Sequence, residues 1–258
     1  MPFTPAHAAA ALPFLRTRLV LSALIVGTLA PDFEYFLRLA PGGGFGHTLA
    51  GAFLFSLPLA LVILWMFHVL VKAPLLRLFP DALRRRIPAE RFRFGGPSRF
   101  MLIVGSALVG IFTHIVWDSF THSYMWPARH FPWLNEKQSL PLVGPVEHCA
   151  LLQQASTITG LAILGFWLVR WYRNTALIYG ATEVPMSAER RWLVLGGVVG
   201  VACGGTLLRA LLVAYTPGLT HKWATVLGDS AATVIALAWW ALVLYSIAFR
   251  VAESQAEA

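Results

Sequence analysis

Long apolar runs alternate with short polar segments along most of the chain. Five of these runs reach the roughly 20 helical residues that are needed to cross the hydrocarbon core of a bilayer. A backbone in lipid must satisfy its own hydrogen bonds, so runs of this length predict helices. We therefore expect an all-α, polytopic membrane helical bundle, organised as one membrane domain over residues 1–258. The predicted spans are residues 48–71, 100–120, 149–169, 192–214 and 226–249.

Two shorter apolar segments precede the first span, Pro5–Leu12 and Leu19–Ala30. Thr4 can cap the first segment and Pro13 is expected to break it, whereas Pro31 ends the second. Neither segment is long enough to span a bilayer. They can form a short helical hairpin that enters and leaves on one side, or residues 19–39 can span alone. We favour the hairpin because it brings His7 and Asp32 to the same end.

Composition supports a membrane protein and sets its expected orientation. Of the 258 residues, 57% are hydrophobic and only 12% are charged, against about 25% charged in soluble domains. The net charge of +8 does not indicate nucleic-acid binding, because most arginines lie in residues 72–99 and 170–191. Such loops are cytoplasmic by the positive-inside rule, which places residues 121–148 outside. Membrane lipids are the expected partners, and the oligomeric state stays open.

The second span ends in a stripe of polar residues with metal-ligand chemistry. His114, Asp118 and His122 are four residues apart, so a helix presents them on one face. A carboxylate near the hydrocarbon is costly unless it is paired. Asp118 can bond to a neighbouring histidine at a capped helix end, or it can bind a metal with the histidines.

The predicted topology favours the metal. It gathers most histidines and two of the four aspartates at the outer ends of the spans, with His114 one turn deeper. Nitrogen and carboxylate ligands suit zinc, and their number allows one or two divalent transition-metal ions. The candidate ligands are His7, Asp32, His47, His114, Asp118, His122 and His148. We interpret His68, His130 and His221 as structural.

Four motifs resemble those of a family of uncharacterised bacterial integral-membrane proteins, a domain of unknown function. They are Pro5-Ala-His7, residues 30–35 (Ala-Pro-Asp-Phe-Glu-Tyr), Gly46-His-Thr48 and residues 113–122 (Thr-His-Ile-Val-Trp-Asp-Ser-Phe-Thr-His). The resemblance covers most of residues 1–170, and residues 171–258 add two further helices. That family looks related to metal-dependent hydrolases of the bacterial inner membrane, which implies a multi-pass protein of that membrane. With the topology above, the site would face the periplasmic or extracellular side.

The order of the candidate ligands also resembles, remotely, the zinc-dependent phospholipase C and single-strand nuclease superfamily. His7, Asp32, His47, His114 and Asp118 match that order of His, Asp, His and His-x-x-x-Asp. His122 and His148 match it only approximately. The superfamily's final Glu has no counterpart, because Leu152 stands four residues after His148.

These resemblances imply a membrane-embedded hydrolase, and phosphoester hydrolysis on a lipid or another amphiphile is the expected chemistry. Asp32 is the expected base or bridging ligand, and Glu34 or Glu147 the proton donor. Arg129, Arg38 and His130 are candidate phosphate-binding residues. A metal-stabilised scaffold without activity and a transporter remain alternatives. The later spans, however, carry only Arg209 and Asp229 as charged residues, and these can pair with each other.

Overall fold

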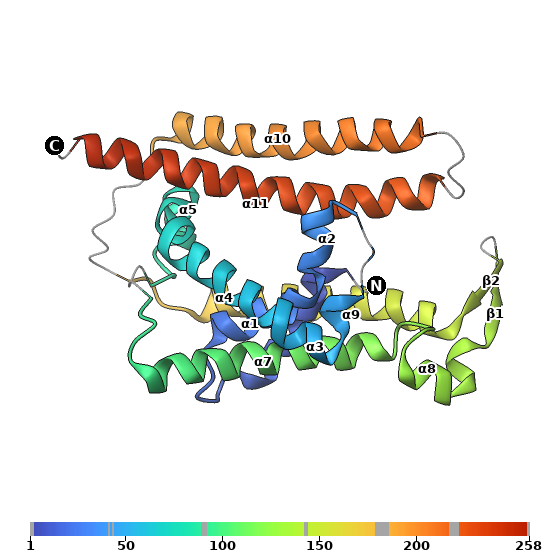
Figure 1. Cartoon of the computed structure of the whole chain (residues 1–258). Helices are drawn as coiled ribbons and strands as arrows, with labels where there is room; N and C mark the ends of the chain where they lie inside the picture. Colours follow the sequence, from blue (N-terminus) through green and yellow to red (C-terminus); the bar gives the residue numbers. More distant parts are fainter. Residues whose placement is uncertain are drawn as a thin grey trace. The chain divides into compact units, whose positions relative to one another are not determined.

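The structure is a computed structural model that describes residues 3–40, 42, 44–88, 92–141, 144–178, 186–216 and 222–256. Helices make up almost all of this part of the chain, and one small hairpin supplies its β structure (Figure 1). The predicted all-α class is therefore confirmed. His221 lies outside the described residues.

Five helical segments are long and apolar enough to cross a membrane, as predicted. The first, Leu49–Leu78, is continuous but mixed: it joins α3 (Leu49–Gly51), α4 (Leu57–Met66) and α5 (Lys72–Leu78) through two π-helical stretches, Ala52–Ser56 and Phe67–Val71. The chain is thus a multi-pass membrane protein. The other four spans lie in α7 (Pro97–Ser119), α9 (His148–Asn174), α10 (Ala188–Ala214) and α11 (Lys222–Ala256).

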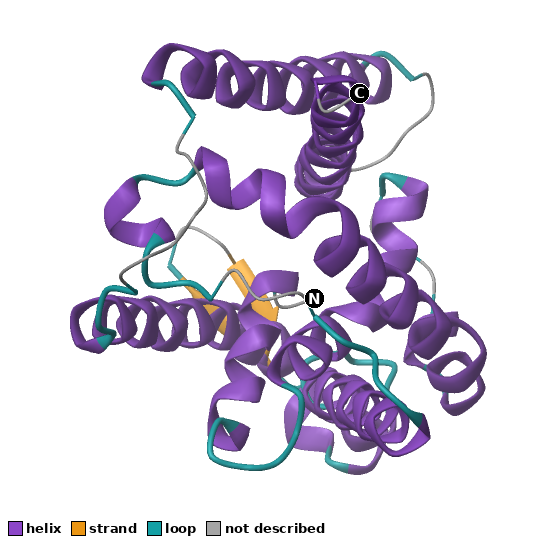
Figure 2. Cartoon of the chain, turned by 90° about the vertical axis from the view of Figure 1, so that its left-hand side faces the viewer, coloured by secondary structure: helices purple, strands orange, loops and turns teal. Residues whose placement is uncertain are grey.

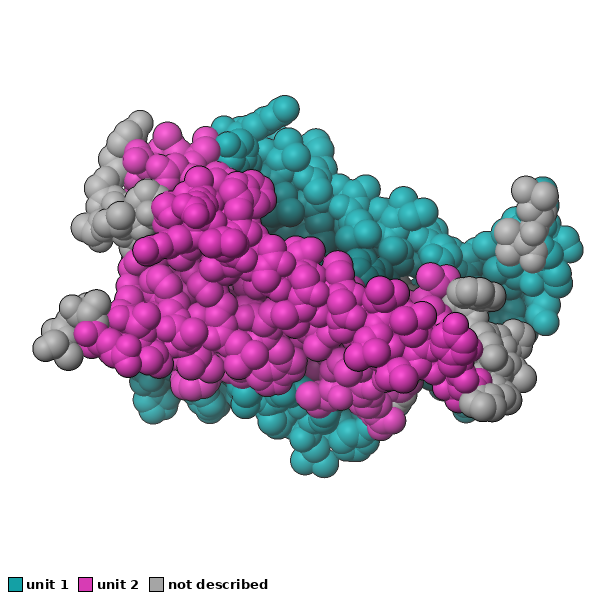
Figure 3. Space-filling view, turned by 90° about the horizontal axis from the view of Figure 1, so that it is seen from above, with its two compact units in different colours: residues 1–32, 44–64, 94–174 teal, residues 33–43, 65–93, 175–258 magenta. Residues whose placement is uncertain are grey.

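The chain divides into two compact units, which Figure 3 colours separately. The first unit comprises residues 1–32, 44–64 and 94–174, and the second comprises residues 33–43, 65–93 and 175–258. The seven candidate ligands can share a site within one unit only if all of them belong to it. All of the candidate ligands do fall in the first unit.

The N-terminal segments form the predicted hairpin-like arrangement. A 3-10 helix, η1 (Thr4–Phe14), packs against α1 (Leu21–Leu29), which continues into the short 3-10 helix η2 (Ala30–Asp32). Two local expectations were wrong. Pro13 does not break the first helix, which continues through it to Phe14. Thr4 is the first residue of η1 and does not cap it, because its hydroxyl bonds to Asp32.

Helix α1 lies directly on α7 because glycine permits close approach of the two backbones. A Cβ atom at Gly27 would collide with the carbonyl oxygen of Ala107, and one at Gly110 would collide with that of Leu24. Small residues at such contacts are typical of helix pairs in membranes, where close packing replaces the hydrophobic effect. The contact fixes α1 against α7 near Ala107 and Gly110.

Residues 121–148, expected as a loop, contain ordered elements that lie outside the candidate spans (Figure 2). Helix α8 (Trp126–His130) is followed by the antiparallel hairpin of β1 (Lys137–Leu140) and β2 (Gly144–Glu147). A small apolar cluster of Ala128, Leu134 and Cys149 lies beneath them. The segment has too few apolar residues in a regular pattern for its sequence to reveal these elements.

In the second unit, α10 and α11 lie side by side (Figures 1 and 2). The two charged residues of the predicted spans in these helices pair as expected, with 3.1 Å between a guanidinium nitrogen of Arg209 and Oδ2 of Asp229. Arg209 also donates to the carbonyl oxygen of Leu39, which follows the short helix α2 (Phe33–Arg38). Arg209 therefore has two partners within the second unit.

Candidate metal centre

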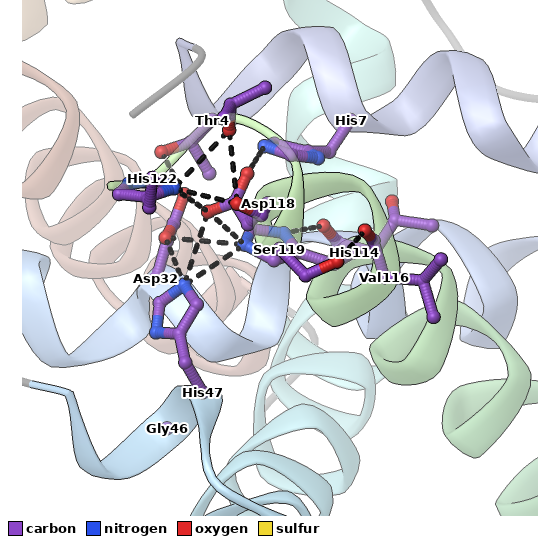
Figure 4. Close-up of polar contacts among 12 residues, drawn as sticks. Thr4, His7, Asp32, Gly46, His47, His114, Val116, Asp118, Ser119 and His122 are labelled. Atoms are coloured by element: carbon purple, nitrogen blue, oxygen red, sulfur yellow. Dashed lines mark hydrogen bonds and ion pairs between the residues drawn. The ribbon is translucent and has the colours of Figure 1, made fainter. Parts of the chain in front are cut away.

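Four of the predicted ligands converge on one point in the first unit (Figure 4). Asp32, His47, His114 and Asp118 each offer one donor atom, and these four atoms all lie within 4.8 Å of one another. Asp32, His114 and Asp118 are fully buried and His47 is 7% exposed. A pair of aspartates buried together is costly in a bilayer protein unless a cation compensates their charge.

The spacing of the donor atoms matches a coordination shell. The Nε2 atoms of His47 and His114 are 3.2 Å apart. Both lie 3.4–3.5 Å from Oδ1 of Asp32 and 3.4 Å from Oδ2 of Asp118. Metal–ligand bonds of about 2.0–2.1 Å give a tetrahedron with edges of about 3.3–3.4 Å. Five of the six edges therefore have the length that a tetrahedral zinc site requires.

The ring orientation of His114 identifies the atom that faces the centre. Its Nδ1 lies 2.8 Å from the carbonyl oxygen of Thr28, an acceptor, so Nδ1 carries the proton and donates. Nε2 is then the ring atom that faces the two carboxylates. Metal-bound histidines are normally fixed in this way through their second nitrogen.

Several buried polar atoms at the centre have no hydrogen-bond partner among the described residues. They include Oδ1 of Asp32 and both carboxylate oxygens of Asp118. Buried polar atoms in folded proteins are normally satisfied, and unsatisfied ones often mark a missing ion or water. Acceptors that point at one another from several elements fit a cation between them.

Local structure explains how the chain delivers these side chains. His114 and Asp118 lie one turn apart on the buried face of α7. His47 ends a 3-10 turn, Phe45–His47, immediately before Thr48, which caps α3 by accepting from the backbone N–H of Gly51. Asp32 follows Pro31 at the end of η2, so the contact of α1 with α7 brings it to the two residues on α7.

The electrostatics of the candidate ligands outside the spans reflect attraction between the buried carboxylates and the histidines. Burial raises the pKa of Asp32, but the charge of His114 and hydrogen bonds from its neighbours outweigh this and lower the pKa well below its usual range. Burial lowers the pKa of His47, but its contacts with Asp118 and Asp32 raise it above the ordinary value on balance. Asp32 therefore stays ionised, and the carboxylates attract positive charge.

His7 and His122 lie beside the four-atom group but outside it. Nε2 of His7 is 3.2 Å from Oδ1 of Asp118, and its ring stacks on His114 with the centroids 3.8 Å apart. Nδ1 of His122 is 3.9 Å from Oδ2 of Asp118, but it lies closer, at 2.9 Å, to the backbone oxygen of the same residue. Both histidines reach Asp118, and coordination by either remains a prediction.

The other predicted site residues have their own local partners. His148, at the start of α9, makes a 2.8 Å contact from Nδ1 to the carbonyl oxygen of Trp133. Glu34 is buried on α2 and pairs with Arg38 at 2.7 Å. Arg129 is exposed on α8. The four-atom group includes none of them, and their proposed roles remain predictions.

Sequence reasoning missed one polar residue at the centre. Thr4 is buried, and its hydroxyl donates to Oδ2 of Asp32 at 2.6 Å. Its position before an Ala-rich segment indicated a helix cap. The signal that could have found it is the spacing of three residues between Thr4 and His7, which puts both on one face of a helix.

The family of the chain follows from a profile that matches residues 1–247, described as a domain of unknown function (DUF4184). The chain belongs to this family. The match extends past residue 170 and includes α10 and most of α11, so the last two spans are part of the family's domain. Comparisons with curated proteins and with solved structures find no match.

Proposed function

We propose that this DUF4184 protein is a membrane-embedded, metal-dependent hydrolase that holds a divalent transition-metal ion at Asp32, His47, His114 and Asp118. Zinc suits this mixture of imidazole and carboxylate donors, with manganese and iron as related choices. The observation that carries the proposal is the set of 3.2–3.5 Å distances among four buried donor atoms from three separate elements.

The chemistry follows from the nature of such ions. A bound zinc ion lowers the pKa of a coordinated water to about 7 and so supplies hydroxide at neutral pH. The residues of this chain hold and orient that centre: Thr28 fixes the ring of His114, and Thr4 fixes the carboxylate of Asp32. Asp32 is the proposed base.

We infer that the substrate is a phosphoester on a lipid or another amphiphile. The ordered segment after α7 carries exposed aromatic side chains, which favour the headgroup level of a bilayer. Arg129, on the same segment, can bind a phosphate, as can Arg38. The aromatic residues are Phe120, Tyr124, Trp126, Phe131 and Trp133. The arginine distribution supports a site on the outer side of the membrane, and the bacterial cytoplasmic membrane is the location that the resemblance implies.

The test is metal content and activity of the purified full-length protein. Mass spectrometry of protein prepared without chelators should find about one transition-metal ion per chain. The Asp118→Asn variant should lose most of that metal together with any cleavage of lipid or soluble phosphoesters, because it removes ligand charge and keeps the shape.

Asp229→Asn is the matched control, since it makes the same change at a second buried aspartate in a span. It should retain the metal. A wild-type protein without transition metal, or an Asp118→Asn variant with full occupancy, would contradict the proposal.

One observation favours a second candidate, a scaffold that keeps the metal for folding. Four protein donors complete a tetrahedron, and closed four-ligand zinc sites are usually structural, whereas catalytic sites keep one position open. Bound metal without cleavage of any phosphomonoester or phosphodiester would select the scaffold.

A further inference from the structure

The N-terminal 3-10 helix η1 reaches the candidate metal centre through two side chains. Thr4 donates its hydroxyl to Oδ2 of Asp32 at 2.6 Å. Nε2 of His7 lies 3.2 Å from Oδ1 of Asp118. Each carboxylate thus has one oxygen against η1, and its other oxygen faces the Nε2 atoms of His47 and His114.

The helix type makes this double contact possible. A 3-10 helix has three residues per turn, so side chains at i and i+3 are eclipsed. Thr4 and His7 have this spacing and therefore project in the same direction, as Figure 4 shows. Runs of 3-10 helix beyond three or four residues are uncommon, yet η1 extends over 11 residues.

The surroundings hold η1 in place. The backbone N–H of Phe3 donates to the hydroxyl of Thr157 on α9 at 3.0 Å. Ala6 lies against Gly160 of α9, where a Cβ atom would contact the Ala6 methyl group and carbonyl oxygen. Ala6 and Ala11 are completely buried. The face that carries Thr4 and His7 is therefore docked in a defined position.

The two ring nitrogens of His7 distinguish it from a metal ligand. A metal-bound histidine usually donates its second N–H to an acceptor, as His114 does to Thr28. Neither ring nitrogen of His7 has a hydrogen-bond partner among the described residues, and Oδ1 of Asp118 lies 3.2 Å from Nε2. A carboxylate oxygen at this distance favours a proton on Nε2, and that proton would prevent coordination through the same atom.

We propose that η1 orients both metal-binding carboxylates, with Thr4 and His7 acting as positioning residues that leave one oxygen of each aspartate for the ion. The proposal rests on the proposed metal site. It assigns a role to Thr4 and changes that of His7 from ligand to hydrogen-bond donor. Partners of this kind typically contribute 10- to 100-fold to metal affinity, in order of magnitude.

The experiment is a Co²⁺ titration of the full-length protein in detergent, followed by visible absorption, which reports the ligand set and geometry. Thr4→Val keeps the shape and removes the donor, so Co²⁺ affinity should fall about 10- to 100-fold. Thr4→Ser should restore it. Thr206→Val is the control, because Thr206 bonds within α10 of the second unit.

His7→Gln tests the second residue independently. It keeps an N–H donor in place of the ring and should weaken binding while retaining the wild-type absorption spectrum. Asp118→Asn provides the reference for a lost ligand and should change the spectrum. A general loss of stability would reduce the folded fraction without the selective rescue by Thr4→Ser.

The outcomes separate the two proposals. If the wild type binds no Co²⁺, the metal site itself is wrong. If the wild type binds Co²⁺ and Thr4→Val binds it equally well, the role of Thr4 is overturned and the site stands. If His7→Gln alters the spectrum as strongly as Asp118→Asn, His7 is a ligand and its positioning role is overturned. The His7 variant decides the matter if Thr4→Val does not fold.

Discussion

Replacing Asp32 by Asn distinguishes a metal centre from a cluster of histidine–aspartate ion pairs. Asparagine keeps the shape, and its carbonyl oxygen can still accept the hydrogen bond from Thr4. The substitution removes one of two buried negative charges whose oxygens lie within 4.8 Å of each other. At an effective dielectric constant of about 20, two unit charges at this separation repel by about 3.5 kcal/mol.

The metal and ion-pair interpretations predict different stabilities for Asp32→Asn relative to the wild type when measurements with and without metal are compared. Without metal, the variant loses the contacts of Asp32 with His47 and His114 in both interpretations, and up to about 3.5 kcal/mol of relieved repulsion offsets part of this loss. The interpretations therefore differ in the response to zinc: an ion-pair cluster predicts the same loss of stability with and without zinc, because it binds no ion.

For a metal centre, adding zinc should widen the difference in unfolding temperature between the wild type and Asp32→Asn. At 100 times its dissociation constant, zinc stabilises the wild type by about 2.7 kcal/mol. For a chain of this size that corresponds to a rise of about 5–10 °C in unfolding temperature. Asp32→Asn should show little of this rise, because the ligand charge is gone.

The assay is thermal unfolding in detergent, with chelator and with zinc, followed by circular dichroism. Asp229→Asn serves as the control: it breaks the pair with Arg209 and should lower the unfolding temperature equally in both conditions. If Asp32→Asn destabilises the chelated protein as much as the zinc-loaded one, the metal interpretation is refuted.

Two further predictions concern packing and orientation. Gly110→Val should force α1 away from α7, lower the free energy of unfolding by about 1–3 kcal/mol and weaken metal binding. Gly105→Val is the control, because Gly105 lies on the same helix with open space around it, and it should lower the stability less. Equal losses for the two variants in unfolding and metal-binding assays would contradict the packing argument. In a Cys203→Ala background, a cysteine at Ser139 should react with an impermeant reagent added outside and one at Ser98 should not, because both serines are exposed but the arginines place them on opposite sides; labelling at Ser98 alone would reverse the topology.

Hydropathy alone was sufficient to predict the architecture of this protein. Each predicted span corresponds to a helix in the structure, because unpaired backbone N–H and C=O groups are energetically costly in a bilayer and a helix pairs them all within one segment. The pairing of Arg209 with Asp229 was also predictable, since two opposite charges in neighbouring apolar helices have few other partners.

Sequence spacing identified the four central ligands only in part. His114 and Asp118 share a helical face by their separation alone, and that pair needed no tertiary information. Asp32 and His47 come from other segments. Their approach depends on the α1–α7 contact at Gly27 and Gly110, which no local pattern reveals.

The tertiary structure decided which histidines face the candidate metal centre and which have other partners. In the sequence, His7, His122 and His148 were all candidate ligands, because an imidazole can bind a metal, donate a hydrogen bond or stack on a ring. Their partners in the fold distinguish them: His7 faces a carboxylate oxygen, and the Nδ1 atoms of His122 and His148 face backbone carbonyls. Residue type and order determined which atoms are available, whereas only the packing of distant segments determined which of them face one another.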